Sequence, residues 1–317
     1  MDTIIDIKNL AKQFDSLIAV DNISFQVKKG EVLGFLGPNG AGKSTTMKMI
    51  TGFLLPTSGT VTVDGFDIVQ NPLAVKQKIG YLPEGAPAYP DMTPASFLDF
   101  IAQIRGLSGK EKSHRIADTV TRVNLEAVLY QPIETLSKGF KRRVGLAQAI
   151  LHDPEVLILD EPTDGLDPNQ KFEVRNLIKN MAQEKVIILS THILEEVHAV
   201  CSRAIIIADG KILADGTPAE LEEKSKYHNA VTISMQAEAN QADSIRQALL
   251  KLPSVHKLDT LIETGSFLSY QVFPKKNRSI VGEISQQARK KQWKVEELHV
   301  ERGRLDEVFR SVTTGVA

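Results

Sequence analysis

The stretch GPNGAGKST, residues 37–45, decides the fold because it stands between an apolar run and a helical pattern. It matches G-x-x-x-x-G-K-[ST], and the preceding EVLGFL predicts a strand while the following KSTTMKMI predicts a helix. Glycines in such a loop let successive N–H groups point at phosphate oxygens, and the helix N-terminus adds a field that favours an anion. The stretch therefore predicts a nucleotide-binding loop. A glycine-rich turn without a ligand is the alternative, which this context makes rare.

The chemistry of the side chains assigns roles within this loop. Lys43 is expected to reach the β and γ phosphates, and Ser44 is expected to bind Mg²⁺ through its hydroxyl. The main chain is expected to cradle the remaining phosphate oxygens. The predicted nucleotide-binding residues of the loop are Gly37, Pro38, Asn39, Gly40, Ala41, Gly42, Lys43, Ser44 and Thr45.

Two further apolar strands end in polar side chains. The run VLILDEP ends in Asp160, a candidate Mg²⁺ partner, and Glu161, a candidate general base for an attacking water. The run VIILSTH ends in His192, whose imidazole could contact a γ-phosphate or that water. The alternatives are an acidic pair that stabilises a helix N-terminus and a surface histidine beside Thr191 as a helix cap.

The order of the patterns predicts an α/β protein of two domains. Short apolar strands alternating with helices favour a parallel sheet covered on both faces, and residues 88–150 read as a helical insert. The composition turns polar near residues 223–229, so we expect domains at 1–224 and 225–317. The second domain shows the order βαββαβ of a ferredoxin-like α+β fold, followed by a last helix.

Composition argues against a disordered, collagen-like or disulfide-scaffold chain, and charge argues against a nucleic-acid partner. Hydrophobic residues make up 42% and charged residues 24%, which is typical of a folded globular chain. The 38 basic and 39 acidic residues nearly cancel, so no net basic charge favours nucleic acid. The basic group of Lys138, Lys141, Arg142 and Arg143 is interpreted as a solvated helix face.

The chain is expected to be cytoplasmic. Its N-terminus lacks a secretory pattern, and the single cysteine, Cys201, cannot form an internal disulfide. Its longest apolar runs are far shorter than the ~20 residues of a membrane-spanning helix. If the protein serves a membrane, another chain must cross it.

Taken together, GPNGAGKST, ETLSKGFKRRVGLAQAI, VLILDEPTDGLDP and LSTH resemble the motifs of an ATP-binding-cassette (ABC) ATPase, in that family's order. The resemblance implies a P-loop NTPase domain with an antiparallel β subdomain and a helical subdomain. It also implies a dimer, in which Ser137 and Gly139 contact the γ-phosphate of ATP on the opposite subunit. By the same resemblance Asp167 lies in the loop between the two sites, Phe14 stacks on adenine, and Val20 contacts the nucleotide.

The chain departs from the family pattern at two places. The signature reads LSKGF instead of LSGGQ, so Lys138 replaces a glycine and Phe140 a glutamine. In GYLPEG, Glu84 stands where the family usually has glutamine. A carboxylate keeps an oxygen that can bind Mg²⁺ but loses the amide donor, and YLPE resembles a subgroup of exporter ATPases.

The resemblance implies an ATP-hydrolysing subunit of a transporter, of the ABC-2 exporter type found in drug-resistance, sodium-export and gliding-motility systems. Its partners would be a second copy and a multi-spanning permease at the inner face of the cell membrane. Permease contact is expected near Phe97, Phe100 and Ile101, which could equally fill the helical core. The alternatives are a cassette ATPase acting mechanically on ribosomes or DNA and, less favoured, a phosphotransferring kinase.

Overall fold

The computed structural model describes residues 3–85, 88–264, 266–275 and 278–314. The chain forms two compact units, Met1–Pro218 and Ala219–Ala317. This division lies a few residues before the boundary expected at 224/225. The α/β class expected for the first part and the α+β class expected for the second are both confirmed by the element order.

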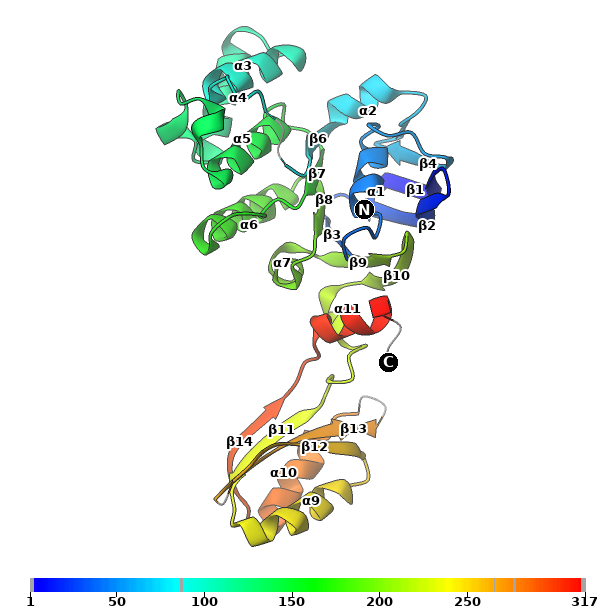
Figure 1. The fold of residues 1–317 in the computed structure, drawn as a ribbon, viewed down its shortest axis with the longest axis vertical. Helices are drawn as coiled ribbons and strands as arrows, with labels where there is room; N and C mark the ends of the chain where they lie inside the picture. Colours follow the sequence, from blue (N-terminus) through cyan, green and yellow to red (C-terminus); the bar gives the residue numbers. More distant parts are fainter. Residues whose placement is uncertain (1–2, 86–87, 265, 276–277, 315–317) are drawn as a thin grey trace. The chain divides into compact units, whose positions relative to one another are not determined.

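A six-stranded sheet forms the centre of the first unit, in the order β10-β9-β3-β8-β7-β6 (Figure 1). Strands β3, β6, β7, β8 and β9 pair in parallel, and β10 joins the edge antiparallel to β9. All residues of β3, β7 and β8 are buried, which explains their unbroken apolar sequences. The strands are β3 Val32–Leu36, β6 Ile79–Leu82, β7 Val156–Asp160, β8 Val186–Thr191, β9 Arg203–Ala208 and β10 Lys211–Gly216.

An antiparallel sheet of the order β2-β1-β4-β5 makes the second layer of this unit. Its inward residues and those of the central sheet pack in one apolar cluster with helix α1, as Ile7, Met47 and Phe35 illustrate. The helix therefore lies between two sheets, which fixes the loop that precedes it. The elements are β1 Thr3–Phe14, β2 Leu17–Lys28, α1 Lys43–Ile50, β4 Ser58–Val63, β5 Phe66–Asp67 and α2 Pro72–Lys78.

The remaining helices of the first unit form a helical layer and the crossovers of the parallel sheet. Helices α3, α4 and α5 pack on one another around residues such as Phe97, Leu98 and Val144, which confirms the helical insert. Helices α6 and α7 follow β7 and β8. Their bounds are α3 Pro94–Ile104, α4 Gly109–Arg122, α5 Lys138–Ile150, α6 Pro168–Ala182 and α7 Leu194–Val200. Within the described residues, no helix has the length and apolar character needed to span a membrane.

The second unit contains a four-stranded antiparallel sheet in the order β12-β13-β11-β14. Helices α9 and α10 cover one of its faces and contact each other (Figure 1). This βαββαβ order is the ferredoxin-like one expected from the sequence. The elements are α8 Pro218–Glu222, β11 Val231–Gln236, α9 Ala242–Leu250, β12 Val255–Glu263, β13 Phe267–Pro274, α10 Val281–Lys290, β14 Lys294–Val300 and α11 Leu305–Thr314.

Candidate functional site

The loop between β3 and α1 has the backbone that its glycines predict. Gly40 and Gly42 have φ of 81° and 100°, a region that favours glycine. A Cβ at Gly42 would lie 2.4 Å from the carbonyl oxygen of Ala19, so no other residue fits there. A Cβ at Gly37 would lie 2.4 Å from the carbonyl oxygen of Ile207, so this glycine lets the loop approach β9. Glycine is therefore required in this loop both by the left-handed backbone and by close packing against neighbouring main chain.

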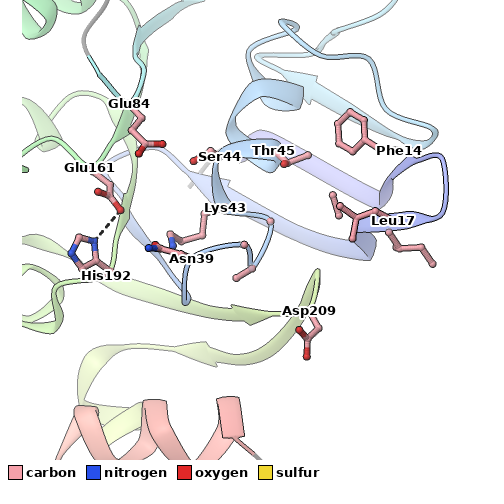
Figure 2. A pocket seen from close by; sticks show the side chains of 15 residues that line it. Phe14, Leu17, Asn39, Lys43, Ser44, Thr45, Glu84, Glu161, His192 and Asp209 are labelled. Carbon is pink, nitrogen blue, oxygen red and sulfur yellow. Dashed lines mark hydrogen bonds and ion pairs between the residues drawn. The ribbon is translucent and has the colours of Figure 1, made fainter.

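A cavity of about 590 Å³ opens over this loop. Figure 2 shows Glu84, Glu161 and His192 on one side of it and Phe14 and Leu17 on the other, with the loop between them. The acidic and imidazole groups thus face the lysine end of the loop, and the apolar groups lie at the far end. The lining residues are Phe14, Leu17, Ile18, Ala19, Asn39, Gly40, Ala41, Gly42, Lys43, Ser44, Thr45, Glu84, Glu161, His192 and Asp209.

Lys43 brings a buried positive charge to this cavity. Its ammonium donates to the carbonyl oxygens of Gly37 at 2.6 Å and Pro38 at 3.1 Å. Burial lowers the pKa of Lys43, and the nearby carboxylates of Glu161, Asp160 and Glu84 oppose that shift. The ammonium is thus placed to meet further negative charge from a ligand.

Asp160 presents a buried carboxylate oxygen that no described residue satisfies. The residue ends β7 and is 1% exposed. Its Oδ1 accepts from the Ser190 hydroxyl, but its buried Oδ2 has no hydrogen-bond partner. Such an orphaned oxygen is costly unless a ligand or ion completes it.

The donor set suits Mg²⁺ shared with a phosphate. The hydroxyl of Ser44 and the carboxylate of Glu84 line the same cavity, and Mg²⁺ prefers a few protein oxygens with phosphate and water. No three or more His, Cys, Asp or Glu side chains of the described residues gather as a metal site by themselves. The fit therefore depends on oxygens from a bound nucleotide.

Glu161 is held from three sides. Its amide donates to the carbonyl oxygen of Ser190 at 3.1 Å, and its carbonyl accepts from the Arg142 guanidinium. Its Oε1 lies 2.9 Å from Nδ1 of His192. Because an ionised carboxylate only accepts, Nδ1 carries the hydrogen of this bond. The φ of Glu161 is 49°, a left-handed value that this residue adopts only when its surroundings impose it.

The structure corrects the interpretation of the basic group at the start of α5. Arg142 and Arg143 are only 7% and 9% exposed, so they are not part of a solvated face. Arg142 donates to main-chain carbonyls, including that of Pro83 at 2.9 Å, and Arg143 pairs with Glu173 at 2.8 Å. The expectation failed because buried carbonyls, which leave no trace in the charge pattern, satisfy the guanidinium.

Several predicted residues lie away from the cavity lining. Val20 is fully buried in the core, because the alternation of β2 turns it inward. Ser137 caps α5 by accepting from the amide of Phe140 at 3.3 Å, and Asp167 caps α6 by accepting from that of Gln170 at 2.9 Å. A Cβ at Gly139 would lie 2.5 Å from the side-chain oxygen of Gln170. The roles predicted for these residues stay predictions.

Four lining residues were not predicted from the sequence. Leu17, Ile18 and Ala19 begin β2, which the turn of Asp15 and Ser16 separates from Phe14, and Asp209 follows β9. Leu17 and Ile18 are 64% and 53% exposed, which is high for aliphatic side chains. Their closeness to Phe14 in the sequence was the one signal that could have identified them.

Comparisons with known proteins agree with this geometry. The family described as ABC transporter matches residues 20–164. The linearmycin resistance ATP-binding protein LnrL of Bacillus subtilis (strain 168) is 40% identical over 215 residues, which are 68% of this chain and 69% of that protein. The probable multidrug ABC transporter ATP-binding protein YbhF of Escherichia coli (strain K12) is 37% identical over 225 residues, 71% of this chain. The match spans only 39% of YbhF.

A solved structure supports the same fold. The protein described as the ATP binding subunit of an ABC transporter superposes with a TM-score of 0.65 at 30% identity. The superposition covers 70% of this chain and 93% of that one.

Proposed function

The chain belongs to the ABC transporter ATP-binding proteins, and we propose from that premise that it binds and hydrolyses ATP as the cytoplasmic subunit of an exporter. The observation that carries the proposal is the pairing of Glu161 with His192 across one cavity from the phosphate-binding loop. A base, an imidazole and a phosphate site in one cavity suit the attack of water on a terminal phosphate.

Binding would follow the length of the cavity. The amides at the N-terminus of α1 and the Lys43 ammonium hold the phosphates, which supply the negative charge that the ammonium meets. Phe14, which is 43% exposed at the far end, offers its ring to the adenine. Ser44, Asp160 and Glu84 would hold Mg²⁺, which supplies charge neutralisation at the phosphate oxygens when bound.

Hydrolysis would depend on how Glu161 is held. Its carboxylate accepts a hydrogen bond from an attacking water and orients that water toward the γ-phosphate. His192 fixes the carboxylate through Nδ1, and its Nε2 is left to contact the phosphate or the water. Most of the rate enhancement then comes from positioning and charge rather than from covalent chemistry.

The working unit is a dimer in this proposal. Ser137 and Gly139, at the N-terminal turn of α5, do not line the described cavity of their own chain. In this proposal they contact the ATP that a second copy holds. ATP then bridges the two copies, and hydrolysis removes the bridge. The two copies close and open because the closed dimer contacts the γ-phosphate from both sides and the open dimer does not.

A permease would dock on the helical layer beside Glu84. Phe97 is 2% exposed and belongs to the core, which corrects its expected role as a contact residue. Of the other two expected residues, Ile101 packs against the helical core and Phe100 is kept as a docking residue. Tyr89, which was not expected from the sequence, joins it, since Tyr89 is 54% exposed and packs edge-on against Phe97 and Phe100. Export is supported by the relatives described as linearmycin resistance and multidrug proteins, since resistance is commonly achieved by removing the compound.

Recovery of partners tests the transporter proposal against a mechanical role on ribosomes or DNA. A tagged Glu161→Gln chain is purified with ATP from gently solubilised membranes of cells that carry it naturally, and its companions are identified by mass spectrometry. We expect one multi-spanning membrane chain in stoichiometric amount. Ribosomes or DNA without a membrane chain would contradict the transporter proposal. A Lys43→Ala chain, which should bind ATP more weakly, is the matched control for ATP dependence.

A further inference from the structure

A second cavity, of about 260 Å³, lies in the second unit at the end of α10. Ile233 of β11 and Ala288 of α10 are buried on its walls, and Val295 and Leu298 of the edge strand β14 complete its apolar side. Trp293, in the turn between α10 and β14, lines it as well and is only partly buried. Trp293, Val295 and Leu298 are only partly buried, so their side chains form an apolar surface open to a ligand.

Basic residues cluster in the sequence beside the residues that line this cavity. Arg289 is part of the lining, and Lys290, Lys291 and Lys294 follow it within six residues. Among the described residues no acidic side chain forms an ion pair with any of these four cations, whereas Lys257 and Arg310 elsewhere in the unit are paired. The concentration of unpaired charge favours an anion.

The end of α10 is capped by its own main chain. The carbonyl oxygens of Gln287, Ala288 and Arg289 accept from the amides of residues 291–293, so they are already used. The left-handed Gln292, with φ of 55°, makes the turn that brings Trp293 back over the cavity. Glu296 of β14 accepts a hydrogen bond from the side-chain amide of Gln236.

We propose that this cavity binds a small amphipathic carboxylate, with the acid group at Arg289 and the apolar chain against Trp293. The volume holds roughly nine groups of the size of a water molecule, which suits a short fatty acid and is too small for a two-chain lipid. The site is independent of ATP, so it gives the second unit a ligand of its own. The occupancy of this site would follow the concentration of the carboxylate and would not depend on the proposed ATP hydrolysis.

The single tryptophan of the chain provides a direct assay. The full chain is titrated with octanoate while Trp293 fluorescence is followed. Octanol, which has the apolar chain without the charge, and acetate, which has the carboxylate without the long apolar chain, are the two comparison ligands. We expect a saturable change with octanoate that is at least tenfold weaker for each analogue. Arg289→Gln should weaken octanoate binding at least tenfold, and Arg246→Gln, an exposed cation of α9, should leave it unchanged.

Two outcomes would overturn the proposal. One is the absence of a saturable response to octanoate, and the other is an equal response in wild type and Arg289→Gln. If the chain gives no octanoate response but sediments with phosphatidylglycerol vesicles, the basic, aromatic turn is assigned to a membrane surface. Since the titration contains no ATP, either result leaves the proposed ATPase function untouched.

Discussion

Arg142 and Glu161 are joined through the main chain, because the Arg142 guanidinium donates to the Glu161 carbonyl. The same guanidinium donates to the carbonyls of Asp160 and Pro83, which precedes Glu84. One buried side chain of α5 therefore connects the helical layer to both ends of the proposed Mg²⁺ and water site. A movement of α5 would be transmitted to the left-handed Glu161.

Arg142→Met should impair turnover more than binding. Loss of the guanidinium frees Glu161 to leave its position, and small misplacements of catalytic groups cost on the order of 10- to 100-fold in rate. We expect kcat for ATP hydrolysis to fall by that factor while KM changes less than twofold, with partial recovery in Arg142→Lys. Lys141→Met, one residue away, is the control and should keep both constants. An equal loss of binding and turnover would contradict a positioning role.

Lys43→Ala should weaken ATP binding. A hydrogen bond to a charged group contributes about 1.5–3 kcal/mol, so we expect affinity to fall roughly 10- to 100-fold. Isothermal titration calorimetry measures this directly. Lys48→Ala removes an exposed cation from the same helix and should bind ATP normally. Unchanged affinity in Lys43→Ala would remove Lys43 from the phosphate site.

Phe14→Ala should weaken the binding of ATP, because the adenine loses its stacking partner. Alanine substitution of an aromatic residue under a base costs about 1–3 kcal/mol. The ring lies at the far end of the cavity from the phosphates, so binding of inorganic tripolyphosphate should not change. Phe66→Ala, an exposed ring of β5, is the control. Equal losses for ATP and tripolyphosphate would show that the ring supports the loop rather than the base.

His152 should make folding sensitive to acid. Burial, followed by the nearby Arg105, lowers the pKa of His152 to about 4, and its Nε2 lies 3.2 Å from the carbonyl oxygen of Ile79. The unfolded chain takes up a proton near pH 6.5 and the folded chain only near pH 4, so stability falls as the pH falls between these values. We expect a loss on the order of 2–3 kcal/mol across this window. Urea unfolding at pH 7 and pH 4.5 should show a smaller difference in His152→Leu.

Much of the fold was predictable because its signals are local. Strands β3, β7 and β8 are buried on both faces and therefore continuous in apolar residues. Strand β6 was not predicted, since it has four residues and includes Gly80, where a Cβ would lie 2.0 Å from the Ala149 carbonyl oxygen. A packing requirement of that kind depends on a distant helix and leaves no periodic pattern.

The cavity was predictable at its phosphate end and less so at the other. The loop, Glu161 and His192 follow from motifs at strand ends, where a parallel sheet places its ligands. The sequence singled out Val20 and not Leu17, Ile18 or Ala19, whereas the structure places Val20 in the core and the other three on the cavity wall. The burial of Arg142 depends on carbonyls about 20 residues away, so its role required the structure.

ATP hydrolysis by the Glu161→Gln chain tests whether the Glu161 carboxylate orients the attacking water. Phosphate release and ATP binding are measured in parallel on wild type, Glu161→Gln and Glu195→Gln, the last being an exposed carboxylate of α7 with a side-chain accessibility of 86%. The account predicts ATP binding in all three, turnover in wild type and Glu195→Gln, and a rate lower by a factor on the order of 10²–10⁴ in Glu161→Gln. A Glu161→Gln chain that hydrolyses ATP at the wild-type rate would contradict it.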